Sequence, residues 1–245
     1  MPLTFAHPAI ILPLKHLPKR WYSLTGLIAG SMTPDFEYFI RMQVKSNYSH
    51  TLSGLFWFDV PLGILLSYVY LVLVRDGFID NLPRFLNSRF SKYQYLPLNI
   101  SLLSVAVMAC SVFIGSASHL FWDGFTHPKG YFVQHFPALT KTMSLGGHRV
   151  FIYKILQHGS TFIGFAAIAA VIIPMPKNEA VRTHTIGKYW VIVVLSIVLI
   201  TIIRLSIGLK LHQIGNLLVT VIAGGLIGLI VVSLILIKNT RINVR

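Results

Sequence analysis

Five long apolar stretches constrain this chain more than any other feature of its sequence. A transmembrane helix needs about 20 consecutive apolar residues to cross the hydrocarbon core of a bilayer. Only 11% of the residues are charged, whereas a soluble domain carries about 25%. The sequence therefore predicts an all-α, polytopic helical membrane protein with about five to six transmembrane helices. The predicted spans cover approximately residues 52–74, 101–125, 150–173, 189–207 and 214–237.

The chain before the first span predicts a short helical hairpin. One apolar piece covers about residues 7–14, and a second covers residues 24–40, where Pro34 and Asp35 interrupt it. Neither piece is long enough to be a comfortable full span. We expect a short or re-entrant hairpin that returns Asp35 to the same side as His7.

The charge balance points to lipid. The net charge is +14, from 21 Lys and Arg against 7 Asp and Glu. In a chain with this many spans, such an excess indicates topology and contact with anionic headgroups, so we expect membrane lipids and no nucleic acid as partners. With the hairpin in place, most basic residues fall on one side, which the positive-inside rule makes cytoplasmic. The C-terminus is then cytoplasmic.

The unusual polar residues fall in the first part of the chain, which suggests two regions. Residues 1–175 should form a helical membrane domain that carries the polar residues discussed below. Residues 176–245 should add two C-terminal transmembrane helices that pack on it as part of one structural unit. Gly224 and Gly228 have the small-xxx-small spacing of a helix-packing contact. Gly146 and Gly147 stand alone, without the further glycines and the lysine of a phosphate-binding loop.

The end of the second predicted span carries the most unusual polar residues. His119 and Asp123 are four residues apart, so both lie on one helical face, and His127 follows four residues later. Imidazole and carboxylate groups arranged in this way can share a divalent metal. Ionisable groups inside a membrane are costly, which makes this a functional-site hypothesis. The alternative is a hydrogen-bonded His119–Asp123 pair that ties helices together.

Other histidines and one carboxylate should reach the same membrane face under this topology, near the side opposite the C-terminus. They could supply the ligands of one or two divalent ions, with zinc the best match. Each also has a structural alternative, such as Asp35 capping a helix break or His158 bonding a carbonyl. Glu37 and Arg149 could support a reaction carried out by a metal-bound water, Arg149 by stabilising a phosphate-like transition state. The candidate ligands are His7, Asp35, His50, His119, Asp123, His127 and His158.

Five segments, taken in order, resemble an uncharacterised family of bacterial multi-pass membrane proteins over about the first 175 residues. The resemblance implies a location in the bacterial cytoplasmic (inner) membrane. The segments are Pro-Leu-Thr-Phe-Ala-His7-Pro-Ala, Met-Thr-Pro-Asp35-Phe-Glu-Tyr-Phe, His50-Thr-Leu-Ser-Gly-Leu-Phe, Ser118-His119-Leu-Phe-Trp-Asp123-Gly-Phe-Thr-His127 and Leu-Gln-His158-Gly-Ser-Thr.

The order of these histidines and aspartates also resembles membrane-bound metal-dependent hydrolases regulated by LexA. More distantly, it is similar to the zinc-dependent phospholipase C and single-strand nuclease fold, which holds three zinc ions. The resemblance implies one metal held by Asp35, His50, His119 and Asp123. It implies a second that Asp123 shares with His7, and a third near His127 and His158. Two features depart from the soluble enzymes: six residues precede His7, and Phe162 occupies the position of a later carboxylate.

Three functions remain open. The leading expectation is a membrane-embedded, metal-dependent hydrolase, a phosphoesterase that acts on an amphiphilic or lipid substrate. The first alternative is a non-catalytic membrane scaffold or partner-binding protein with a structural His/Asp site. The second is a cation or proton transporter, although the sequence lacks the internal repeat and the matched broken helices of many transporters.

Overall fold

The computed structural model describes residues 3–178 and 186–242. Within these ranges, five helices are long and apolar enough to cross a membrane, and the structure is 75% helical. The predicted all-α, polytopic fold is therefore confirmed, and the protein is an integral membrane protein. The five candidate spans are Leu52–Asp80, Leu102–His135, Ile152–Ile172, Ile186–Ser206 and Ile214–Leu236.

The chain forms two compact units. Unit 1 consists of residues 1–35, 47–66 and 100–174, and unit 2 consists of residues 36–46, 67–99 and 175–245. Unit 1 ends beside the predicted boundary at residue 175. Two earlier segments, however, belong with the C-terminal helices. That all parts pack as one structural unit stays a prediction.

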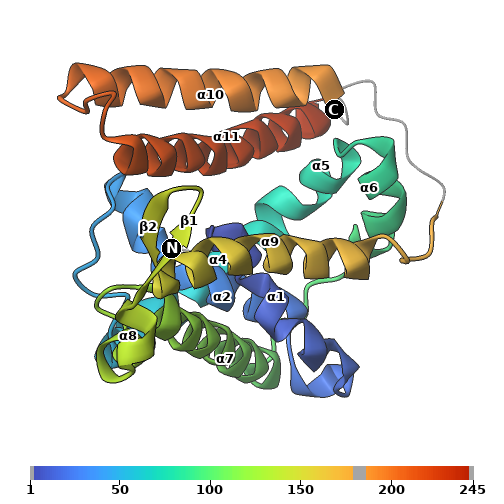
Figure 1. The fold of residues 1–245 in the computed structure, drawn as a ribbon. Helices are drawn as coiled ribbons and strands as arrows, with labels where there is room; N and C mark the ends of the chain where they lie inside the picture. The colour runs from blue at the N-terminus through green and yellow to red at the C-terminus, as the bar shows by residue number, and fades with distance from the viewer. Residues whose placement is uncertain (1–2, 179–185, 243–245) are drawn as a thin grey trace. The chain divides into compact units, whose positions relative to one another are not determined.

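Unit 1 holds the N-terminal helices and two long spans (Figure 1). Helices α2 and α4 begin in unit 1 and end in unit 2. In chain order the elements are η1 (Thr4–Ala6), α1 (Pro8–Ile11), η2 (Leu12–His16), η3 (Lys19–Trp21), α2 (Leu24–Arg41), α3 (Leu52–Gly54), the π-helical η4 (Leu55–Asp59), α4 (Val60–Val69), α7 (Leu102–Thr126), α8 (Tyr131–His135), η7 (Pro137–Thr140), β1 (Thr142–Leu145), β2 (His148–Phe151) and α9 (Ile152–Ile172).

Helix α2 continues through Pro34, where the sequence suggested an interruption. A proline inside a helix has no N–H to donate to the carbonyl four residues earlier, which here is that of Gly30. Ser116 on α7 donates its hydroxyl to the Gly30 carbonyl at 3.0 Å instead. This long-range hydrogen bond satisfies the group that Pro34 leaves free, so the helix need not end there.

Glycines let α2 and α7 approach backbone to backbone. A Cβ atom on Gly30 would lie 2.2 Å from the Val112 carbonyl oxygen, and one on Gly115 would lie 2.4 Å from the Leu27 carbonyl oxygen. The short N-terminal helices and α2 form the predicted hairpin. It does return Asp35 to His7, because Thr4, three residues before His7, donates a hydrogen bond to Asp35.

A β-hairpin interrupts the helices of unit 1 (Figure 1). Strands β1 and β2 pair antiparallel from Thr142 opposite Phe151 to Leu145 opposite His148. Gly146 and Gly147 form the turn with φ values of +54° and +81°. Two consecutive residues with positive φ are typical of a type I′ hairpin turn, which explains this pair of glycines.

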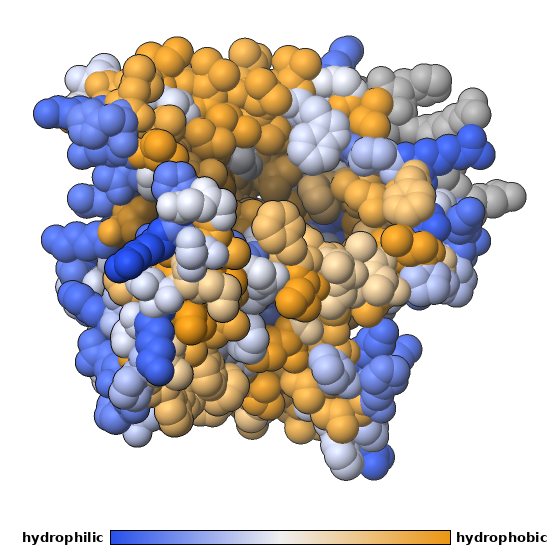
Figure 2. Space-filling model, viewed as in Figure 1, coloured by the Kyte–Doolittle hydropathy of each residue, from blue (hydrophilic) through white to orange (hydrophobic). Residues whose placement is uncertain are grey.

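Unit 2 is built around its last two helices, which run side by side (Figure 1). Gly224 and Gly228 do pack against α10, because a Cβ on either would lie within 3.0 Å of an α10 backbone atom. The surface over α10 is apolar (Figure 2), as expected of a lipid-facing helix. Besides the ends of α2 and α4, the elements are the π-helical η5 (Tyr70–Val74), α5 (Arg75–Asp80), α6 (Arg84–Phe90), η6 (Ser91–Tyr93), α10 (Ile186–Ser206) and α11 (Ile214–Ile242).

Candidate metal centre

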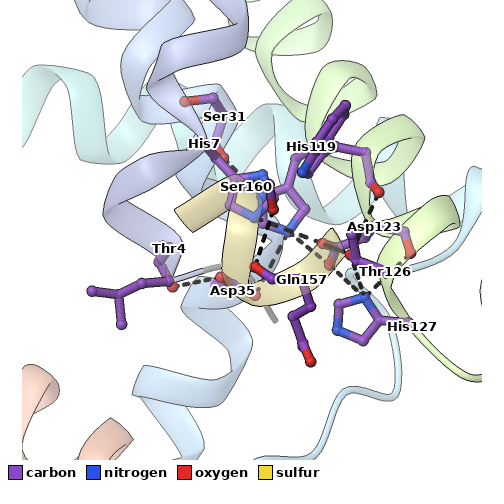
Figure 3. Close-up of polar contacts among 12 residues, drawn as sticks. Thr4, His7, Ser31, Asp35, His119, Asp123, Thr126, His127, Gln157 and Ser160 are labelled. Carbon is purple, nitrogen blue, oxygen red and sulfur yellow. Dashed lines mark hydrogen bonds and ion pairs between the residues drawn. The ribbon is translucent and has the colours of Figure 1, made fainter. Parts of the chain in front are cut away.

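Helix α7 carries the centre of a buried cluster in unit 1 (Figure 3). His119 Nε2 lies 3.3 Å from Asp123 Oδ2 across one helical turn, as the spacing of four residues predicted. His119 is fully buried and Asp123 nearly so. The close approach of α2 that the glycines allow brings Asp35, also fully buried, beside them.

Side-chain atoms of Asp35, His50, His119 and Asp123 approach one another at distances longer than hydrogen bonds. His119 Nε2 is 3.6 Å from Asp35 Oδ1. His50 Nε2 is 3.5 Å from Asp35 Oδ1 and 3.7 Å from Asp123 Oδ2. These distances exceed those of good N–H···O hydrogen bonds. They approach the roughly 3.3 Å that separates two ligands bound at about 2.0–2.1 Å around a tetrahedral ion.

Two more histidines border this set. His7 Nε2 lies 3.7 Å from Asp123 Oδ1, and its ring stacks on that of His119 with centroids 3.7 Å apart. His127 Nδ1 lies 3.4 Å from Asp123 Oδ2. Asp123 therefore turns one oxygen toward His7 and the other toward His119 and His127. Among the described residues, geometry alone gives two possible metal-binding groups, His7 with His119 and Asp123, and Asp35 with His50 and His119.

The two groups share one nitrogen and so cannot each take a separate ion through His119. Its Nδ1 lies 2.7 Å from the Ser31 carbonyl, to which it donates, so only Nε2 is left for a metal. The arrangement fits one ion among Asp35, His50, His119 and Asp123. A second ion would have to use His7 and the other Asp123 oxygen.

Unsatisfied buried atoms support a metal at this place. In the described part of the chain, several buried side-chain atoms of the cluster have no hydrogen-bond partner, whereas most buried polar atoms in proteins have one. The side chains of His7, Asp35, His119 and Asp123 converge in Figure 3. A divalent cation would satisfy such a group of lone pairs, so the residues fit a metal. The atoms are both ring nitrogens of His7, Asp35 Oδ1, His119 Nε2, Asp123 Oδ2 and His127 Nε2.

Hydrogen bonds from residues around the cluster orient the side chains that could bind a metal. Besides the Ser31 carbonyl behind His119, Thr4 donates to Asp35 Oδ2 and leaves Oδ1 directed at the cluster. The Ser49 hydroxyl lies 3.0 Å from His50 Nδ1. Metal-binding histidines commonly use their second nitrogen in this way, which fixes the tautomer. The other nitrogen then keeps its lone pair for the ion.

The pKa values of His7, His50 and Asp35 follow from burial and from the charges of their neighbours. Burial, together with the nearby His119, lowers the pKa of His7 to about 3. Burial alone would also lower the pKa of His50, but attraction by Asp123 and Asp35 raises it to about 9. Burial would raise the pKa of Asp35, yet His119 and His50 hold it below its usual value. His7 is thus neutral at pH 7, the form that binds metals.

Replacing Thr4 by valine tests the outer hydrogen bonds. The change keeps the shape of the side chain and removes the donor to Asp35. We expect weaker metal binding by roughly 10- to 100-fold, the usual effect of losing an outer partner, with the fold retained. Isothermal titration with Zn²⁺ in detergent measures the affinity. Thr51→Val, which removes a hydroxyl that caps α3 in the same unit, is the control and should bind zinc normally.

The structure does not place every candidate site residue in the cluster. His158 on α9 and Arg149 on β2 are exposed, and neither belongs to the two groups of possible ligands. Glu37 belongs to unit 2, where Arg41 donates to it at 2.8 Å. The six other candidate ligands lie together in unit 1. Their role as ligands stays a prediction.

The residues that form hydrogen bonds to the candidate ligands were not predicted from the sequence. Thr4 lies three residues before His7 and Ser49 directly before His50, but short polar residues next to a histidine are too common to be a signal. The Ser31 carbonyl could not be found from the sequence. Its role depends on the contact between α2 and α7.

Comparison with known proteins identifies the family. The chain belongs to the family described as "Domain of unknown function (DUF4184)", whose model matches residues 1–234. The expected membership of an uncharacterised family of membrane proteins is thus confirmed, and the match extends beyond the first 175 residues. No curated protein and no solved structure matches the chain.

Proposed function

We propose that this protein is a membrane-embedded, metal-dependent hydrolase. One observation carries the proposal: the cluster has more side-chain atoms able to bind a metal than one closed metal site needs. Asp35, His50, His119 and Asp123 would complete a tetrahedral shell. His7 and His127 still keep buried nitrogens without a hydrogen-bond partner.

These additional metal-binding side chains favour a catalytic role over a structural one. Leaving buried polar groups unsatisfied costs free energy, and a purely structural site gains nothing from it. A catalytic centre needs such groups, because they can bind a second ion, orient a water molecule or hold a substrate oxygen. His7, neutral at pH 7, can accept a hydrogen bond there.

Zinc and a phosphoester are the proposed metal and substrate class. Imidazoles, which bind a metal once they are deprotonated, suit zinc when they are mixed with carboxylates. A bound zinc ion would polarise a phosphoryl oxygen and make its water acidic enough to supply hydroxide near neutral pH. The resemblance of the His and Asp order to the LexA-regulated hydrolases and to the zinc-dependent phospholipase C fold supports the same class. A site within a membrane protein favours an amphiphilic or lipid substrate.

A structural metal site is the alternative, and one observation favours it. Four distances among the atoms of Asp35, His50, His119 and Asp123, between 3.3 and 3.7 Å, are close to those of a closed tetrahedral shell, which is typical of structural zinc. The protein would then be a membrane scaffold or partner-binding protein. We further propose a bacterial inner membrane, a cytoplasmic C-terminus and a metal centre near the opposite face, from the distribution of basic residues.

Cobalt substitution separates the two proposals. Co²⁺ replaces zinc and reports its coordination through visible absorption bands. A catalytic centre has an exchangeable position, so inorganic phosphate should shift these bands, and the zinc-loaded protein should hydrolyse bis(4-nitrophenyl) phosphate. Bands that do not respond to phosphate, together with no hydrolysis, would refute the hydrolase and favour the scaffold. His127→Ala is the informative variant, because it should reduce hydrolysis more than cobalt binding.

A further inference from the structure

The connection between α7 and α9 lies at the same end of α7 as the candidate metal centre. Helix α7 ends at Thr126, directly before His127, and α9 begins at Ile152, directly after β2. Both helices belong to the candidate membrane spans. A connection of this length must therefore lie at the membrane surface on the side of the metal centre.

One face of the β-hairpin in this connection is mainly apolar: it carries Met143, Leu145 and Val150, beside His148. Side chains alternate between the two faces of a strand, and the pairing places Met143 opposite Val150 and Leu145 opposite His148. Thr142 and Ser144 lie on the other face of β1. Strand β1 is therefore amphipathic along its whole length.

Met143 and Leu145 on this face remain about half exposed in the described structure. Met143 is 51% exposed and Leu145 is 48% exposed. A two-stranded hairpin is only marginally stable in water unless one face packs on something. The base of the hairpin is anchored, because the Ile152 backbone N–H donates to the Lys141 carbonyl at 2.9 Å and the ring of Phe151 stacks near that of Tyr153. The Met143–Leu145 face still requires an apolar partner.

The charges around the hairpin identify a suitable partner. Residues 124–178 contain no Asp or Glu. Lys141, Arg149 and Lys154 are all exposed in or beside the hairpin. Basic residues next to exposed apolar side chains at a membrane surface are typical of segments that bind anionic lipid.

We propose that the hairpin of β1 and β2 is a binding element for anionic phospholipid. Met143 and Leu145 insert among the upper parts of the acyl chains. Lys141 and Arg149 contact the phosphate groups of the surrounding headgroups. The partner class is therefore the anionic lipid surface beside the metal centre. The proposal requires neither a bound metal nor a reaction.

Spin labels on four consecutive residues test the inserted face. In a Cys110→Ala background, which removes the single cysteine, one cysteine is introduced in turn by Thr142→Cys, Met143→Cys, Ser144→Cys and Leu145→Cys. The labelled full chain is reconstituted in vesicles of phosphatidylcholine with phosphatidylglycerol. Power-saturation measurements then compare accessibility to oxygen, which concentrates in lipid, with accessibility to a water-soluble nickel chelate.

The expected result alternates along the strand. The ratio of oxygen to nickel accessibility should be several-fold higher at positions 143 and 145 than at 142 and 144. High nickel accessibility at all four positions would place the hairpin in water and overturn the proposal. Low accessibility to both reagents at 143 and 145 would mean that protein covers the face, either another part of the chain or a second copy, and would overturn it too.

The preference for anionic lipid needs its own comparison. In phosphatidylcholine alone, the accessibility ratio at position 145 should fall several-fold. Lys141→Gln/Arg149→Gln should remove this dependence on phosphatidylglycerol, whereas Lys19→Gln, which removes a cation from η3 in the same unit, should leave it unchanged. Equal ratios in both lipids would refute the anionic preference. Because the readout needs no metal, its result is independent of the proposed hydrolase.

Discussion

Replacing Asp123 by asparagine is expected to abolish stoichiometric metal binding while the protein still folds. Asp123 is the carboxylate that His7, His50, His119 and His127 all approach, at 3.3–3.7 Å. Asparagine keeps the size of the side chain but removes the negative charge that balances these imidazoles. The affinity should fall by more than the roughly 10- to 100-fold typical of losing an outer partner. Elemental mass spectrometry of protein purified without chelator measures the bound metal.

Asp59→Asn is the matched control for this variant. Asp59 is also a fully buried aspartate of unit 1, but it belongs to neither group of possible ligands. It should retain the metal content of the wild type. Stoichiometric metal in Asp123→Asn would contradict the candidate centre. A wild-type protein without metal would contradict it as well, and would leave His119 and Asp123 as a pair that ties helices together.

The parts of the fold that were predictable depend on short-range patterns. The spans are visible because each one is a continuous apolar run, and the His119–Asp123 pair is visible because a helix repeats about every four residues. The glycine turn at residues 146 and 147 also had a local signal, since consecutive glycines suit a type I′ turn. The pair was compared only with phosphate-binding loops, so the β-hairpin was not predicted.

The parts that were not predictable depend on contacts between distant residues. Pro34 reads as a helix break because the sequence near it contains nothing that satisfies the Gly30 carbonyl. The hydroxyl that does so belongs to Ser116, 86 residues later. The same limit applies to the metal centre. The packing of α2, α7 and α9 decides which candidate residues lie in the cluster. It brings Asp35 into the cluster and leaves His158 outside.

The packing of α2 on α7 therefore supports both the stability of unit 1 and its candidate metal centre, and Gly30→Ala should damage both. The added Cβ would lie 2.2 Å from the Val112 carbonyl oxygen, a backbone atom that cannot move aside alone. The two helices would have to separate. This would stretch the hydrogen bond from Ser116 to Gly30 and that from His119 to Ser31. Overpacking of this kind costs about 1–3 kcal/mol, so Tm should fall by roughly 2–12 °C.

Gly159→Ala provides the comparison, because it is the same change in a helix of the same unit where a Cβ would meet nothing within 4 Å. Alanine is a better helix former than glycine by about 1 kcal/mol, so this variant should keep or raise Tm. Thermal unfolding in detergent, with and without Zn²⁺, measures both effects. Gly30→Ala should also bind zinc more weakly, because a separated α2 moves Asp35 away from His119. Equal Tm and equal zinc affinity in the two variants would show that the close approach of α2 and α7 does not build the metal centre.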